Sequence, residues 1–236
     1  MKVLITRAHE DAAALADLLQ AHGIAALIDP LLTIDWSEGP PLDVRSVQAL
    51  LMTSANGVRA FCRRNRERHL AVYAVGDATA QEAMAQGFSQ VKTAAGDVAA
   101  LAALVRQQLS PDGGSLLHCA GTRLAGDLGG ELSHAGYGYR REVLYAARAS
   151  EQLSPDTVAG LQAGQLDGVL LYSPRTAAIF SACIGRAGLQ PALSQVTAYC
   201  LSPAVGEGIR DLPWQFVAVA KSPTQTALLE IVLARI

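Results

Sequence analysis

The chain has 236 residues, of which half are apolar and 17% are charged, and its formal net charge is −2. This length allows one large domain or two modest ones. No apolar run reaches the roughly 18 residues that span a bilayer, and the N-terminal stretch lacks the apolar core of a signal peptide. We therefore expect a cytoplasmic protein without a membrane segment. The arginine cluster at 62–68 stands alone, which argues against nucleic-acid binding.

The cysteines and histidines show no metal-binding pattern. The four cysteines lie far apart without a CxxC pair, and the five histidines show neither HxxxH nor HExxH spacing. Isolated cysteines in a reducing compartment are most simply small buried apolar residues. The sequence predicts no metal site, and we expect no cofactor.

Short β-branched or leucine-rich runs recur along the chain, and each is followed by an alanine-rich segment with helical spacing. Strands that alternate with helices predict an α/β fold, in which a mainly parallel sheet is covered on both faces. The expected strands lie at 2–6, 49–54, 70–76, 89–94, 115–120, 168–173, 196–202 and 215–222.

Two helices share one pattern of leucines and a final glycine. In the helix expected over 10–23, Gly23 stands where a glycine ends a helix, and the apolar stripe consists of Ala12, Leu15, Leu18 and Leu19. In the helix expected over 124–136, Gly136 takes the stop position, and the stripe consists of Leu124, Leu128 and Leu132.

A strand-to-helix corner also occurs twice, at 50–61 and at 170–180. Ser54 and Ser173 stand at the two bends, where a serine can accept a hydrogen bond from the first turn of a helix. Pro174 follows at the first helical position, where its missing N–H costs little. Both corners are expected at the carboxyl ends of sheet strands, the edge at which open α/β sheets bind ligands. The core stripes of the two helices are Val58, Phe61 and Cys62, and Ala177, Phe180 and Ile184.

These repeated features indicate a duplicated half-chain. Along the chain, the number of residues between matching positions increases slowly, while the order of the positions stays the same. Loop insertions in the second copy would produce this pattern. The separations are 113 for Gly23 and Gly136, 119 for Ser54 and Ser173, 126 for Tyr73 and Tyr199, and 127 for Asp97 and Thr224. The residues alone favour two sequential domains, divided at the Pro/Gly/Ser turn cluster 110–115.

Six motifs, taken in order, resemble the uroporphyrinogen-III synthase family from end to end. They are VLITR at 3–7, TSANGVRAF at 53–61, YAVGDATAQEA at 73–83, VLY at 143–145, LLYSPRTAAIF at 170–180 and SPTQTALL at 222–229.

The resemblance implies a different division of the chain. In this family each flavodoxin-like parallel-sheet domain is built from parts of both copies. Residues 1–32 and 149–236 would form one domain, and residues 35–146 would form the other. The segments 32–36 and 145–149 would be the strands of a two-stranded hinge, with the active site in the interdomain cleft.

The resemblance also implies the reaction. The family cyclises hydroxymethylbilane, a chain of four pyrroles with acetate and propionate arms, to uroporphyrinogen III with inversion of the last ring and loss of water. It serves haem, sirohaem and cobalamin biosynthesis as a lyase. We further expect a monomer without a cofactor, and transient contact with hydroxymethylbilane synthase.

The expected site uses helix starts rather than an arginine-rich surface, because the protein is slightly acidic and backbone N–H groups at helix starts bind carboxylates. Tyr145 is the expected catalytic acid, since a phenol is protonated at neutral pH and can donate to the departing hydroxyl. Ring packing is the alternative role for Tyr145, and capping is the alternative for each serine and for Thr79. A salt bridge within its own domain is the alternative for Arg7. The expected substrate-binding residues are Arg7, Ser54, Ala55, Asn56, Thr79, Ser173, Pro174, Arg175, Ser202, Pro203 and Ala204, with Asp77 at the start of the helix that holds Thr79.

The chain departs from the family pattern at two places. Ala204 and Val205 occupy the positions of a threonine pair that many members carry, and Ser202 occupies a position where glycine is common. One alternative is a two-domain α/β protein that binds a small anionic ligand without catalysis. Another is a flavodoxin-like or Rossmann nucleotide enzyme, although GxGxxG is missing after the first strand.

Overall fold

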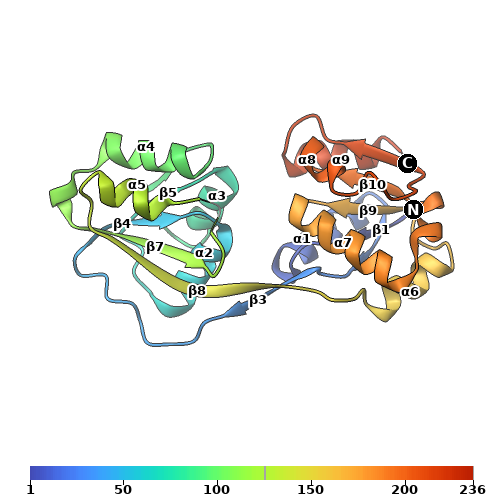
Figure 1. Ribbon diagram of the computed structural model, residues 1–236, viewed down its shortest axis with the longest axis horizontal. Helices are drawn as coiled ribbons and strands as arrows, with labels where there is room; N and C mark the ends of the chain where they lie inside the picture. The colour runs from blue at the N-terminus through green and yellow to red at the C-terminus, as the bar shows by residue number, and fades with distance from the viewer. Residues whose placement is uncertain (125, 236) are drawn as a thin grey trace. The chain divides into compact units, whose positions relative to one another are not determined.

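The computed structural model describes residues 1–124 and 126–235, which form two compact units (Figure 1). Unit 1 consists of Met1–Thr33 and Arg148–Ile236, and unit 2 of Ile34–Ala147. The chain begins in unit 1, completes unit 2 and then returns to unit 1. The turn cluster at 110–115 lies inside unit 2, where it forms the short 3-10 helix η1 (Pro111–Gly113) and the start of a strand.

Unit 1 is a five-stranded parallel sheet. Its strands follow the order β11 (Phe216–Val219), β10 (Thr197–Cys200), β9 (Gly168–Leu171), β1 (Lys2–Ile5) and β2 (Ala25–Ile28). Numbered along the chain within the unit, this order is 2-1-3-4-5 from the other edge, as in flavodoxin. The central strands β9 and β10 are buried along their whole length, because helices cover both faces of a parallel sheet.

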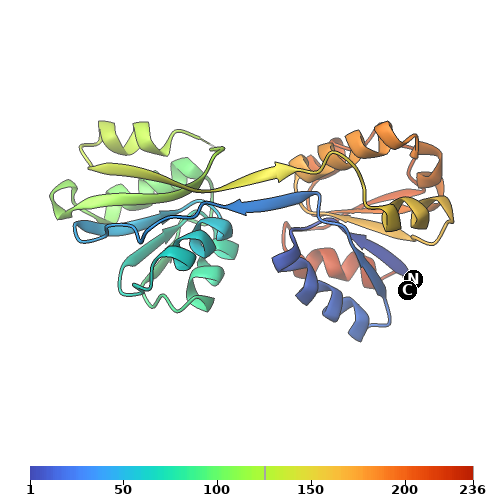
Figure 2. The same cartoon turned by 90° about the horizontal axis from the view of Figure 1, so that it is seen from below.

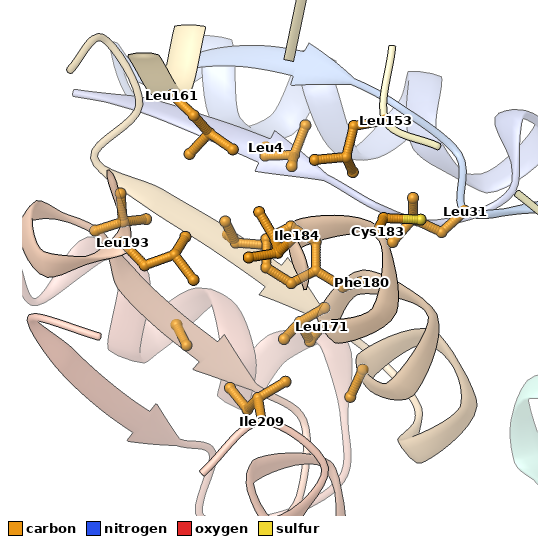
Figure 3. Close-up of a cluster of buried hydrophobic side chains, with 14 of the residues drawn as sticks. Leu4, Leu31, Leu153, Leu161, Leu171, Phe180, Cys183, Ile184, Leu193 and Ile209 are labelled. Carbon is orange, nitrogen blue, oxygen red and sulfur yellow. The ribbon is translucent and has the colours of Figure 1, made fainter. Parts of the chain in front are cut away.

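Helices lie on both faces of the unit 1 sheet (Figure 2). One face packs against α1 (His9–Ala21) and α9 (Gln225–Leu233). The other packs against α6 (Pro155–Gln162), α7 (Pro174–Ala187) and α8 (Pro203–Glu207), with the 3-10 helix η2 (Gln190–Gln195) beside them. Figure 3 shows this second layer, in which Leu4 and Leu171 of the sheet meet Phe180 and Ile184 of α7.

Unit 2 has a six-stranded sheet. Its order is β3 (Leu32–Trp36), β8 (Tyr139–Ala149), β7 (Ser115–Gly121), β4 (Val47–Met52), β5 (Ala71–Ala74) and β6 (Val91–Thr93). The pairs from β8 to β6 are parallel, whereas β3 runs against β8 (Figure 2). The helices α2 (Ala55–Arg64) and α3 (Asp77–Ala85) cover one face, and α4 (Val98–Gln108) and α5 (Leu128–His134) cover the other.

The two sheets are related by the duplication, residue by residue. In unit 1, Leu4 of β1 pairs with Val169 of β9. In unit 2, Leu117 of β7 pairs with Leu50 of β4. Leu117 follows Leu4 by 113 residues and Val169 follows Leu50 by 119, the two separations that the sequence shows. Each sheet therefore joins the first strands of one copy to the later strands of the other.

The predicted helix ends are confirmed. Gly23 and Gly136 have φ angles of +74° and +87°, in the left-handed region that glycine adopts without strain. The predicted corners are also confirmed, because Ser54 and Ser173 are the N-caps of α2 and α7, and Pro174 occupies the first turn of α7. The mainly parallel α/β architecture that the strand pattern predicts is confirmed as well.

The prediction of a core position is wrong for two leucines, Leu18 and Leu124. Leu18 is 45% exposed, because it lies on the flank of α1 whereas Ala12, Leu15 and Leu19 face the sheet. Leu124 is also 45% exposed and precedes α5, which begins only at Leu128. The N-cap Asp127 fixes that start by accepting from the Gly130 N–H at 2.8 Å. The Cys62 prediction is partly wrong, since this side chain is only half-buried.

Candidate functional site

The start of α2 is an amide-lined corner at the carboxyl end of β4 in unit 2. Ser54 has extended backbone angles, and its Oγ accepts from the Asn56 N–H at 3.1 Å. The Ala55 N–H is among the first-turn amides that a helix leaves without an intrahelical partner. No described residue of this first turn is acidic, so the positive end of the helix dipole is not neutralised locally.

The start of α3 follows the neighbouring strand β5, so it lies at the same edge of the sheet, and α2 packs against α3. Thr79 is buried there, and its N–H donates to Gly76 O at 3.1 Å. Asp77 occupies the first turn, and its Oδ1 accepts from the Thr93 hydroxyl at 3.3 Å. Because this carboxylate already complements the dipole, α3 attracts an anion less strongly than α2 does.

The start of α7 is the corresponding corner in unit 1, at the carboxyl end of β9. Ser173 Oγ accepts from the Thr176 N–H at 3.1 Å and lies 2.9 Å from Thr176 Oγ1. Pro174 has no N–H, so the first turn of α7 has one amide donor fewer than the first turn of α2. Again, no described first-turn residue is acidic.

The start of α8 follows β10, next to β9, and α8 packs against α7. Ser202 is the N-cap by backbone geometry, but its side chain makes no capping hydrogen bond. Pro203 and Ala204 are exposed, whereas Val205 is buried. This helix has only five residues, so its dipole is the weakest of the four.

Arg7 lies just beyond the end of β1 and is held within unit 1. Its guanidinium donates to Gln225 Oε1 at 2.8 Å, pairs with Asp11 Oδ2 at 3.0 Å and lies 4.5 Å from the centroid of the Tyr172 ring. Burial raises the pKa of Tyr172 to about 12, although the Arg7 charge opposes the shift. The structure therefore places Arg7 in a local network that includes Tyr172, the residue before Ser173.

Tyr145 lies in β8 of unit 2 and is 9% exposed. Its ring packs against Trp36, with the centroids 6.2 Å apart. Tyr145 pairs with Gly121 at the carboxyl end of β7, where its carbonyl accepts from the Thr122 N–H at 3.0 Å. Since β7 is the neighbour of β4, Tyr145 belongs to the same edge of the sheet as the starts of α2 and α3.

The sequence reasoning missed a buried polar chain in unit 2. His118 of β7 contacts Thr53 Oγ1 through Nε2 at 3.0 Å and Tyr139 Oη through Nδ1 at 2.6 Å. Burial first, and then the charge of Arg141, lowers the pKa of His118 to about 4, so the ring is neutral at physiological pH. A histidine inside the apolar run SLLHCA was the available signal, because a buried histidine needs partners.

Within 1–124 and 126–235, no three His, Cys, Asp or Glu residues come close enough to hold a metal ion. The same part of the chain contains no helix with the length and apolar character to cross a membrane. All four cysteines are free thiols, and burial raises the pKa of the Cys200 thiol to about 12.

The comparisons with known proteins agree on one family. Residues 13–230 match the family described as uroporphyrinogen-III synthase HemD. The fold is similar to that of uroporphyrinogen-III synthetase from Helicobacter pylori 26695, with 16% identity, a TM-score of 0.65 and coverage of 100% of this chain and 99% of that chain. It is also similar to a mutant uroporphyrinogen III synthase from the extremely thermophilic bacterium Thermus thermophilus, with 16% identity, a TM-score of 0.54 and coverage of 98% and 97%. None of the curated proteins matches the chain. Because the family match spans most of the sequence, the chain belongs to the uroporphyrinogen-III synthase family.

Proposed function

We propose that this enzyme, a lyase of tetrapyrrole biosynthesis that cyclises hydroxymethylbilane, binds the carboxylate arms of its substrate on helix starts at the carboxyl edges of its sheets. The start of α2 carries this proposal. Ser54 caps the helix, no described first-turn residue is acidic, and the corner shares its sheet edge with Tyr145. The flexible bilane has more carboxylates than any single helix start can bind.

The remaining predicted residues take corresponding roles. The start of α7, with Ser173, Pro174 and Arg175, binds a second carboxylate, and the backbone at 202–204 and the Thr79 hydroxyl add weaker contacts. Arg7 supplies a positive charge over the ring of Tyr172, the residue before Ser173. The support for these roles is the geometry at α7, where Ser173 caps the helix and no described first-turn residue is acidic, so the helix dipole favours an anion.

Tyr145 assists departure of the substrate hydroxyl. The bond between the terminal carbon and the oxygen breaks, the oxygen takes the bond electrons and the phenol proton, and water leaves. The electrons of the adjoining pyrrole stabilise the resulting azafulvene. The substituted carbon of the last ring attacks the azafulvene carbon and gives a spiro intermediate. The bond from that carbon to its original methylene bridge then breaks, which forms a second azafulvene on the neighbouring ring, and the free α-carbon of the last ring attacks this azafulvene, so that the last ring is inverted. The proton released as the pyrroles regain aromaticity restores the phenol. Since the bilane is reactive, positioning supplies most of the selectivity.

The proposal extends to the setting of the enzyme. We assign it to the cytoplasm as a monomer that takes its unstable substrate from hydroxymethylbilane synthase and uses no cofactor. The four free thiols support a reducing compartment.

The start of α2 offers a direct test. Ala55→Pro removes one amide donor at the first helical position, which tolerates proline. Ser54 already has the extended angles that a residue before proline requires, φ −162° and ψ 147°. A lost bond to a carboxylate should raise KM for hydroxymethylbilane about tenfold. The matched control Ala55→Ser keeps the amide and should behave like the wild type. The assay couples a bilane-producing enzyme to separation of the type I and type III isomers. An unchanged KM and isomer ratio for Ala55→Pro would reject binding at α2.

A further inference from the structure

We propose that His118 is a positioning residue for substrate binding, which orients the Thr53 hydroxyl toward a carboxylate of the bilane through a hydrogen-bond chain that begins at Tyr139. The inference rests on the proposed function, because the acceptor for the Thr53 hydroxyl is the substrate carboxylate that we propose to bind at the adjoining start of α2.

This hydrogen-bond chain runs across the unit 2 sheet, from β8 through β7 to the residue that follows β4. His118 lies in β7, opposite Leu51 of β4, and is 1% exposed. Its Nδ1 is 2.6 Å from Tyr139 Oη in β8, and its Nε2 is 3.0 Å from Thr53 Oγ1. Thr53 is partly exposed and directly precedes Ser54, the N-cap of α2. One buried ring thus connects the sheet interior to a hydroxyl at the edge where we place the substrate.

The neutral state of His118 gives the chain a direction. A neutral imidazole donates from one nitrogen and accepts at the other. When Tyr139 donates to Nδ1, Nε2–H donates to Thr53 Oγ1, and the Thr53 O–H remains available for an outside acceptor. In the opposite arrangement the Thr53 O–H donates to Nε2, so Thr53 can offer an outside ligand only the lone pairs of Oγ1. A carboxylate ligand favours the first arrangement, so Thr53 becomes a hydrogen-bond donor to the substrate.

Unit 1 shows that the fold itself does not require this chain. The positions equivalent under the duplication to His118, Tyr139 and Thr53 are Ile5, Ala26 and Tyr172. Ile5 and Ala26 have the strand pairings of His118 and Tyr139, and Tyr172 follows the end of β9 closely, as Thr53 follows β4. Ile5 is fully buried in the apolar core of unit 1, with Ala26 and Tyr172 packed against the same cluster. Since isoleucine and alanine take the places of His118 and Tyr139 in unit 1, the fold does not need the hydrogen-bonded pair, and the polar chain in unit 2 is expected to serve its site.

Four variants separate positioning from stability. Thr53→Val removes the hydroxyl without a large change in shape, and Thr53→Ser keeps it. His118→Gln places an amide near the Nε2 position and retains the bond to Thr53, whereas His118→Asn reaches only the Nδ1 side. Steady-state kinetics with hydroxymethylbilane, type I to type III isomer ratios and thermal unfolding midpoints are measured for each variant and for the double variant Thr53→Val with His118→Asn.

We expect KM to rise about tenfold in Thr53→Val and in His118→Asn, with kcat changed less and more type I product formed. The double variant should be no worse than either single variant, because both remove one interaction. Thr53→Ser and His118→Gln should restore KM to within about threefold of the wild type. If His118→Asn does not fold, the contrast between Thr53→Val and Thr53→Ser still decides the matter.

A wild-type KM for Thr53→Val would overturn the inference, as would effects of Thr53→Val and His118→Asn that multiply in the double variant. Equal losses of thermal stability in both His118 variants with no change in KM would assign the ring to stability alone. The Ala55→Pro result separates this inference from the proposed function. A raised KM in Ala55→Pro beside a normal KM in Thr53→Val would keep the carboxylate at α2 and remove Thr53 from it.

Discussion

Gly121 lies so close to the ring of Tyr145 that a Cβ on the glycine would come within 2.7 Å of Cε2 and 3.2 Å of the hydroxyl oxygen. The glycine therefore determines where the phenol of the proposed acid can lie. Gly121→Ala should displace the ring, destabilise the protein by about 1–3 kcal/mol and lower kcat by about tenfold or more. The check is turnover of hydroxymethylbilane together with urea unfolding. Normal turnover in a folded variant would show that the ring position does not matter for the reaction.

Tyr145→Phe removes only the hydroxyl. The ring contact with Trp36 remains, so the variant should fold, while kcat falls between several-fold and about a hundredfold. If the hydroxyl is what Gly121 positions, then adding Gly121→Ala to Tyr145→Phe should reduce kcat little further. Wild-type turnover in Tyr145→Phe would leave packing as the role of this residue.

Arg59 and Glu82 form an ion pair that joins α2 to α3, with Nη2 and Oε2 2.7 Å apart and the side chains only 17% and 14% exposed. Glu82→Gln removes the carboxylate charge that pairs with this mostly buried guanidinium, and should reduce the free energy of unfolding by about 3 kcal/mol. Replacing both residues, as Arg59→Met with Glu82→Leu, should cost less than the single change. Urea unfolding of the three proteins measures both effects, and equal stability of Glu82→Gln and the wild type would contradict the argument.

His118 should make unit 2 sensitive to acid. Burial lowers the pKa of its ring to about 4, from 6.5 in the unfolded chain. Between these values the unfolded state binds the extra proton, so the contribution is complete above pH 6.5 and is lost as the pH falls toward 4. The loss between pH 7 and pH 5 is about 2 kcal/mol.

The measurement for this prediction is the free energy of unfolding in urea at pH 7 and at pH 5. His118→Gln has no group that titrates there, so its stability should fall less than that of the wild type over the same interval. Parallel losses in the two proteins would assign the acid sensitivity to other groups.

Local chemistry allowed the sequence to predict the corners and the helix ends. Ser54 and Ser173 cap their helices, and Gly23 and Gly136 end theirs, because each feature depends on a few adjacent residues. The alternation of buried strands with helices likewise predicted parallel sheets. The edge strand β2 was missed, because its four residues AALI are short, alanine-rich and incompletely buried.

Features that depend on distant pairing were harder to predict. Leu18 fits the spacing of an apolar stripe, yet the sheet covers only part of that helix face. The polar chain through His118 joins residues 65 and 21 positions apart, so it appears only when the register of β4, β7 and β8 is known. The candidate helix starts and their capping serines could be predicted from the sequence, whereas the polar chain through His118 could not.

The pairing of β1 with β9 also constrains how the protein is made. During synthesis, β1 can pair with β2 early, but it cannot pair with β9 until residues 168–171 have left the ribosome. Unit 2 is continuous and can be completed while the remainder of unit 1 is still being translated. Residues 1–33 therefore lack most of their sheet until the second half of the chain has been synthesised, and a chain that ended between the two copies would contain neither complete sheet.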